Sequence, residues 1–77
     1  MEKILTMELD EHGEFIEMHL NKEGANYLMD KLRRLIEEDE NNDDHLMTED
    51  WGGNELTSDQ QNKREGVKLI HHLKLFY

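Results

Sequence analysis

The chain has 77 residues and a formal net charge of −10, from 19 acidic and nine basic side chains. A single domain of this size buries only about 60% of the surface that its unfolded chain exposes, so a deep cleft enclosing a substrate is disfavoured. The negative charge repels phosphates and anionic lipids, which argues against nucleic acid or a membrane as a partner. There is no cysteine, which excludes disulfides and thiolate metal ligands. Residues 1–8 interrupt their apolar side chains with charges, unlike a signal peptide, and we expect a cytoplasmic protein.

Two runs of alternating apolar and polar residues open the chain. Leu5, Met7 and Leu9 alternate with polar residues, and the segment 16–20 repeats the pattern. This period of two predicts two strands with one apolar face. Gly13 lies between them and adopts positive φ at little cost, so we expect a tight hairpin.

The segment after the hairpin predicts an amphipathic helix. Asn21 can cap its N-terminus with a side-chain oxygen, and Glu23 suits the positive end of the helix dipole. The apolar residues follow helical spacing and form one stripe: Ala25, Leu28, Met29, Leu32, Leu35 and Ile36. We expect this helix to end near Glu38 and to lie across the apolar face of the hairpin.

Six acidic residues fall within the eight positions from Glu37 to Asp44. Negative charge opposes the dipole at a helix C-terminus, so we expect the helix to give way to an acidic loop. Two interpretations stay open, a loop that is merely hydrated and a contact surface for a basic partner. The second involves Asp39, Glu40, Asp43 and Asp44.

Two further strands complete the predicted fold. One covers His45–Thr48 and ends at the break Trp51-Gly52-Gly53, and the alternation of residues 67–76 predicts a long closing strand. The sequence therefore predicts one α+β domain spanning residues 1–77. Its expected order is ββαββ, with a four-stranded, mainly antiparallel sheet in strand order 2-1-3-4 and one helix on one face.

Trp51 is the only tryptophan of the chain. A small core needs a large apolar side chain, and the adjacent glycines would let another backbone approach it closely. Tryptophan is also enriched among the residues that anchor protein–protein interfaces. Both interpretations, core residue and exposed anchor, stay open.

The blocks His45-Leu46-Met47-Thr48, Trp51-Gly52-Gly53, Glu55-Leu56 and 70–76 carry a resemblance that spans nearly the whole chain. Together they resemble immunity family thirty-two, small bacterial proteins of polymorphic toxin systems. The resemblance implies a non-catalytic protein that binds and neutralises a cognate toxin. An acidic protein would associate fastest with a toxin whose surface is basic. The predicted contact residues are Trp51, Glu55, Asp50, Asp39, Glu40, Asp43 and Asp44.

Catalytic and metal-binding motifs are missing from the sequence. The histidines 71 and 72 are neighbours on a predicted strand and point to opposite faces, so they cannot readily bind one metal. A site assembled from His45, His72 and Glu55 is conceivable but lacks a recognisable spacing. We therefore expect no enzyme activity, no metal and no cofactor, with a small metal-dependent hydrolase as the remote alternative.

A homodimeric structural or adaptor module is the main alternative function. The second face of the predicted sheet is a mixed surface with enough apolar area to pair with a second copy. Its expected members are Thr6, Glu8, Phe15, Glu17, Ile70, His72 and Phe76.

Overall fold

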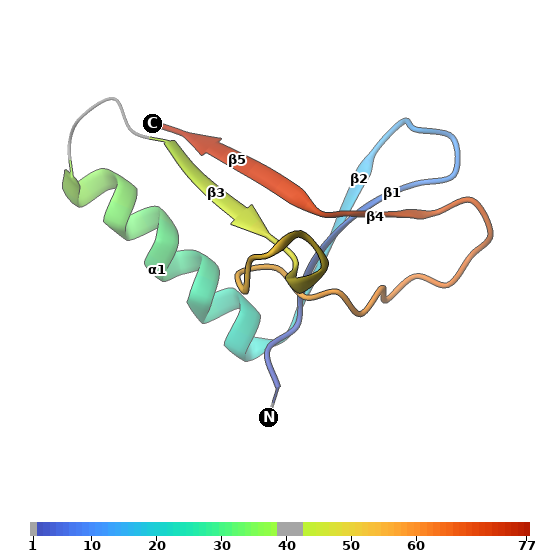
Figure 1. The fold of residues 1–77 in the computed structure, drawn as a ribbon, viewed down its shortest axis with the longest axis horizontal. Coiled ribbons are helices and arrows are strands. Elements are labelled where there is room, and N and C mark those ends of the chain that lie inside the picture. Colours follow the sequence, from blue (N-terminus) through green and yellow to red (C-terminus); the bar gives the residue numbers. More distant parts are fainter. Residues whose placement is uncertain (1, 39–42) are drawn as a thin grey trace.

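The structure, a computed structural model, describes residues 2–38 and 43–77. It has an α+β fold in which one helix accompanies antiparallel strands arranged in two sheets (Figure 1). The elements in chain order are β1 (Leu5–Leu9), β2 (Ile16–Leu20), α1 (Lys22–Glu38), β3 (Asp43–Met47), the 3-10 turn η1 (Glu49–Trp51), β4 (Lys68–Ile70) and β5 (His72–Phe76).

The first sheet has the strand order β2-β1-β4, and both pairings are antiparallel. The predicted hairpin is confirmed, with Leu5 opposite Leu20 and Leu9 opposite Ile16. The Asp10 carboxylate closes its turn by accepting hydrogen bonds from the backbone N–H groups of His12, Glu14 and Phe15. The bond from Phe15, and then those from Glu14 and His12, hold the pKa of Asp10 below its usual range despite burial.

The second sheet pairs β3 with β5, and it replaces the predicted single sheet of four strands. The predicted closing strand is divided at His71 into β4 and β5, which Figure 1 shows as one red ribbon that passes from one sheet to the other. The predicted order 2-1-3-4 is wrong, because the second neighbour of β1 is β4 and not β3. One segment can serve both sheets because its two halves hydrogen-bond to different strands.

The helix α1 begins as predicted, directly after Asn21. The Asn21 Oδ1 atom accepts hydrogen bonds from the backbone N–H of Gly24 and from that of Ile4, each at 2.9 Å. Its Nδ2 atom donates to the carbonyl oxygen of Glu2 at 2.7 Å. Asn21 therefore caps the helix and fastens it to the start of β1.

Replacing Asn21 by alanine should lower the free energy of unfolding by about 1–2 kcal/mol, because two backbone donors lose their acceptor. Urea unfolding followed by circular dichroism measures this change. Asn21→Asp is the matched variant, since its carboxylate keeps both acceptor bonds and loses only the donor bond to the Glu2 carbonyl oxygen, so it should lose less stability than Asn21→Ala. Equal losses for both variants would show that the two acceptor bonds of Asn21 do not stabilise the fold.

The helix packs on the core with only part of its apolar stripe and leaves the apolar residues of β2 exposed, which corrects the prediction that it lies across the face of the hairpin. Leu35 is buried and Leu28 packs on the core, whereas Met29, Leu32 and Ile36 are exposed. The inward side of the helix is set by Gly24, which is buried where the first turn meets the backbone of Ile4. Residues 29, 32 and 36 lie about 100° further round the helix from that side, so they face away from the core.

The core lies between the first sheet and the β3–β5 pair. Its fully buried members are Leu5, Met7, Leu46 and Leu56. Tyr27 and Leu28 from the helix, with Ile70, Leu73 and Leu75 from the closing segment, pack around them. Within the described residues, no helix has the length and apolar character that a bilayer crossing needs.

Candidate functional site

The segment between β3 and Leu56 forms a tight corner, which we call the Trp51 corner and define as residues 48–56. Its first part is the turn η1, in which Trp51 N–H donates to the Thr48 carbonyl oxygen at 3.0 Å. Gly52 ends the turn with φ of 89°, in the left-handed region that favours glycine. The predicted break after β3 is confirmed and has a defined geometry.

Gly53 allows the chain to fold back against the end of β3. A Cβ atom on Gly53 would lie 2.6 Å from the Met47 carbonyl oxygen, so a larger residue would have to move this backbone. The same carbonyl oxygen accepts hydrogen bonds from the N–H groups of Glu55 and Leu56. Leu56 is then buried in the core, and Thr57 N–H donates to the Leu5 carbonyl oxygen at 2.8 Å. The corner is therefore fastened to β3 on one side and to β1 on the other.

The indole of Trp51 lies on the surface of this corner and is 58% exposed. The sequence left open whether Trp51 is a core residue or an exposed residue, and the structure shows that its side chain is exposed. One face of the indole stacks on the ring of His71, with 5.5 Å between centroids and 2° between planes. The Nδ1 atom of His71 is in turn 2.7 Å from Thr48 Oγ1, and Thr48 N–H donates to the His71 carbonyl oxygen. Trp51 is thus held at the point where β4 passes into β5.

Glu55 has a different setting from Trp51. Its Oε1 atom accepts the Met47 N–H at 3.0 Å and its Oε2 atom accepts the Asn54 N–H at 3.1 Å. Burial opposes the ionisation of Glu55, but these hydrogen bonds, with the nearby Lys31 and Lys3, outweigh it and lower the pKa of its carboxyl group. Glu55 therefore stabilises the corner whether or not it also contacts a partner.

The predicted acidic contact residues divide between the two ends of β3. Asp50 is exposed beside Trp51. Asp44 is at the other end, roughly 13 Å further along the strand, and its Oδ2 atom lies 3.7 Å from Lys31 Nζ. The backbone of Asp43 pairs with Phe76 in β3, and Asp39 and Glu40 lie outside the described residues.

A pocket of about 480 Å³ borders the Trp51 corner. Its walls come from the N-terminal segment, the corner and the segment that follows: Glu2, Lys3, Glu49, Asn54, Leu56, Thr57, Ser58 and Asp59. The one cation among these residues, Lys3, is held by the carbonyl oxygens of Asn54 and Glu55 at 2.9 and 2.7 Å and lies over the ring of Tyr27. The Ser58 Oγ atom is buried and has no hydrogen-bond partner. The lining is therefore acidic.

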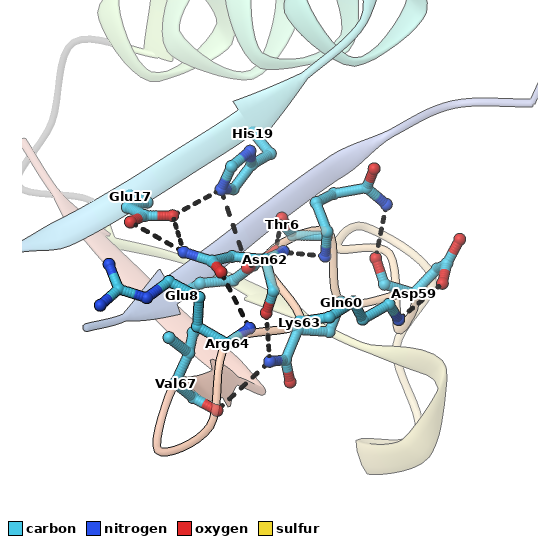
Figure 2. Close-up of polar contacts among 11 residues, drawn as sticks. Thr6, Glu8, Glu17, His19, Asp59, Gln60, Asn62, Lys63, Arg64 and Val67 are labelled. Atoms are coloured by element: carbon cyan, nitrogen blue, oxygen red, sulfur yellow. Dashed lines mark hydrogen bonds and ion pairs between the residues drawn. The ribbon is translucent and has the colours of Figure 1, made fainter. Parts of the chain in front are cut away.

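A second polar cluster, around Glu8, is a feature that the sequence did not predict (Figure 2). Glu8 is fully buried, and its carboxylate accepts hydrogen bonds from Thr6 Oγ1 and from the backbone N–H groups of Gln61 and Asn62. Burial raises the cost of its charge, but these bonds and the nearby His19 outweigh it and lower the pKa of Glu8. The segment after the Trp51 corner is thereby fastened across β1.

This cluster closes the sheet face that was expected to be open. Thr6 and Glu8 are both fully buried, so the predicted dimer surface that included them is wrong. The covering segment also reaches β2, because Asn62 Nδ2 donates to both carboxylate oxygens of Glu17 at 3.1 Å. The polar segment after the Trp51 corner has no sequence pattern that predicts its return across β1. Only the hydrogen bonds from its backbone to Glu8 reveal this return.

Two groups of side chains have atoms of the type that bind metals. Among the described residues, Glu8, Glu17 and His19 bring ligand atoms within 4.8 Å of one another. Both carboxylates already accept protein hydrogen bonds, one of them from His19 Nε2 at 2.8 Å. In the other group, His45 Nδ1 and His72 Nε2 lie 2.8 Å apart, but Glu55 does not join them in the part of the chain that is described.

Comparisons with known proteins give no relative for this chain. No protein-family profile, no curated protein and no solved structure matches it.

Proposed function

We propose that this protein neutralises a cognate bacterial toxin by binding it, as the resemblance to immunity family thirty-two implies. The observation that carries the proposal is the exposed indole of Trp51, fixed on a surface corner by His71 and bordered by an acidic pocket. The binding is stoichiometric and non-catalytic. We place it in the cytoplasm, where a chain without cysteine needs no oxidising conditions to fold.

The setting of Trp51 suits an interface anchor. A large side chain that is already held in one orientation loses little conformational freedom when it binds. One face of the indole is covered by His71, and the rest can be desolvated by a partner. Residues of this type account for most of the affinity of many interfaces, commonly about 2–4 kcal/mol each.

The charge around Trp51 indicates the chemistry of the toxin surface. Glu49 and Asp50 lie in η1 with Trp51, and the adjoining pocket adds Glu2 and Asp59. We expect an arginine or lysine of the toxin to enter this pocket and pair with these carboxylates. The net charge of −10 would steer such a basic surface toward the protein and raise the association rate.

Co-expression in cells tests the proposal. The resemblance implies that the cognate toxin is encoded by a neighbouring gene, and the protein should restore growth to cells that express this toxin. Trp51→Ala should abolish or strongly reduce this protection, because it removes the anchor side chain. The variant should still fold, because Trp51 is exposed and its removal leaves no cavity in the core. Phe76→Ala is the control, since Phe76 is also an exposed aromatic residue, on β5, and this variant should protect like the wild type. Absence of protection by the wild type would contradict the proposed function.

A further inference from the structure

The strand β2 is an unprotected edge of the first sheet. Within residues 2–38 and 43–77 it pairs with β1 on one side only, and the three apolar residues of its inner face remain exposed, Ile16 at 62%, Met18 at 47% and Leu20 at 43%. The other strand ends and edges carry devices that discourage pairing. β4 is short and has Lys68 at its end, β5 has Lys74 in its centre, and β3 has Asp44 near its start.

The hydrogen-bond pattern shows which backbone groups of β2 are unused. Asp10 N–H donates to the Phe15 carbonyl oxygen, and Asn21 N–H donates to that of Ile4, which marks 10–15 and 4–21 as hydrogen-bonded pairs. Because such pairs alternate along an antiparallel ladder, Glu17 and His19 direct their backbone groups toward β1. The N–H and C=O groups of Ile16, Met18 and Leu20 therefore point away from the sheet.

We propose that a second copy of this chain pairs with β2, in an antiparallel arrangement whose two-fold axis passes through Met18. The two three-stranded sheets would then join into one continuous sheet. Met18 would lie opposite the partner subunit's Met18, and Ile16 would lie opposite the partner subunit's Leu20. All the outward-facing backbone groups of β2 would find partners, in about six hydrogen bonds across the axis. The apolar face of β2 would continue onto the same face of its copy.

Complementarity between a carboxylate acceptor, Glu17, and an imidazole, His19, selects the second copy as the occupant and fixes the register. The sequence of β2 is Ile-Glu-Met-His-Leu, so the Met18-centred register places Glu17 opposite the partner subunit's His19. A shift of two residues in either direction keeps the apolar faces together but places Glu17 opposite the partner's Glu17, or His19 opposite the partner's His19. A shift of one residue would set the apolar face against the polar face. One register therefore joins the two apolar faces and places each carboxylate opposite an imidazole.

The proposed dimer is independent of toxin binding, and ionic strength separates the two. Each chain carries a charge of −10, so repulsion opposes the association of two copies, and salt screens that repulsion. The dimer should therefore become stronger between about 50 mM and about 500 mM salt. A complex of this acidic chain with a basic toxin should become weaker over the same range.

Sedimentation equilibrium over a range of protein concentrations tests the dimer. We expect a concentration-dependent monomer–dimer equilibrium for the wild type. Met18→Lys should weaken it at least about tenfold, because it places two ammonium groups at the axis. Phe76→Lys makes the same substitution at an exposed apolar residue of the second sheet and should leave the equilibrium unchanged. Circular dichroism confirms that both variants are folded.

Cross-linking tests the register. The chain has no cysteine, so Met18→Cys introduces a single thiol. Directly opposite residues in a hydrogen-bonded pair have Cα atoms about 5.5 Å apart, within the range that a disulfide spans. Met18→Cys should form a covalent dimer under mild oxidation much faster than Phe76→Cys. A wild type that stays monomeric up to about 1 mM at high salt, or equal cross-linking of the two variants, would overturn the proposal. The edge would then be open to a strand of a different protein.

Discussion

Replacing Gly24 by alanine should destabilise the protein by about 3 kcal/mol, although alanine is the better helix former. Helix propensity alone predicts a gain of about 1 kcal/mol for this change. In the structure, a Cβ atom at Gly24 would lie 1.8 Å from the Ile4 carbonyl oxygen and 2.8 Å from its carbonyl carbon. The helix would have to move away from β1, and it would then lose the bonds that join Asn21 to Ile4 and to Glu2.

Urea unfolding of Gly24→Ala measures this loss. Asn26→Ala is the matched control, because Asn26 lies in the same helix and is exposed. The control should gain a few tenths of a kcal/mol from helix propensity. A Gly24→Ala protein that is as stable as the wild type would mean that the first turn of α1 does not pack against the backbone of β1.

The second large effect is expected at Glu8. Replacing this buried carboxylate by glutamine should cost about 1–3 kcal/mol at pH 7, because one acceptor oxygen becomes an amide donor that faces a backbone N–H. The donors affected belong to Gln61 and Asn62, so the segment after the Trp51 corner should loosen. Hydrogen exchange should therefore quicken most in residues 57–66. Glu14→Gln, which removes the same charge from the exposed hairpin turn, should change stability little.

The contribution of Glu8 to the free energy of unfolding should decrease as the pH falls. Its folded pKa is lower than the value of about 4.5 expected for the unfolded chain, so its ionised form stabilises the fold above that pH. The contribution is lost as the pH falls through the folded pKa. The difference in stability between the wild type and Glu8→Gln should therefore shrink below about pH 4.5. A difference that stays constant down to pH 3 would show that the carboxylate is not held in its charged form.

Local pattern sufficed to predict the elements whose partners are near in sequence. The hairpin, the helix after Asn21 and the break at the paired glycines are set by alternation, capping and backbone freedom within a few residues. The division of the closing strand at His71 could not be predicted in this way, because His71 is the one polar residue on the apolar face of residues 67–76, and a single polar residue does not by itself end a strand. What divides it is a choice of partner strand, and the hydrogen bonds from Thr48 that hold His71 come from a distant segment.

The candidate site was predictable in part for the same reason. Composition marked Trp51 as the distinctive residue, but its exposure depends on the return of the chain after Gly53. The burial of Glu8 was not predictable, since alternation placed it on the polar face of β1 and nothing nearby showed that another segment would cover that face. The apolar stripe of α1 likewise contains more residues than the core covers. Which of them are buried follows only once it is known that Gly24 faces inward.

Titration calorimetry of the purified protein with the toxin of the neighbouring gene tests the central claim most directly. The account predicts a complex of one protein to one toxin, whose affinity falls as salt is added. Trp51→Ala should weaken it by at least about 2 kcal/mol, close to 30-fold, whereas Phe76→Ala should bind like the wild type. Absence of a complex at moderate salt, or a Trp51→Ala variant that binds as tightly as the wild type, would contradict the claim that the Trp51 corner binds a toxin.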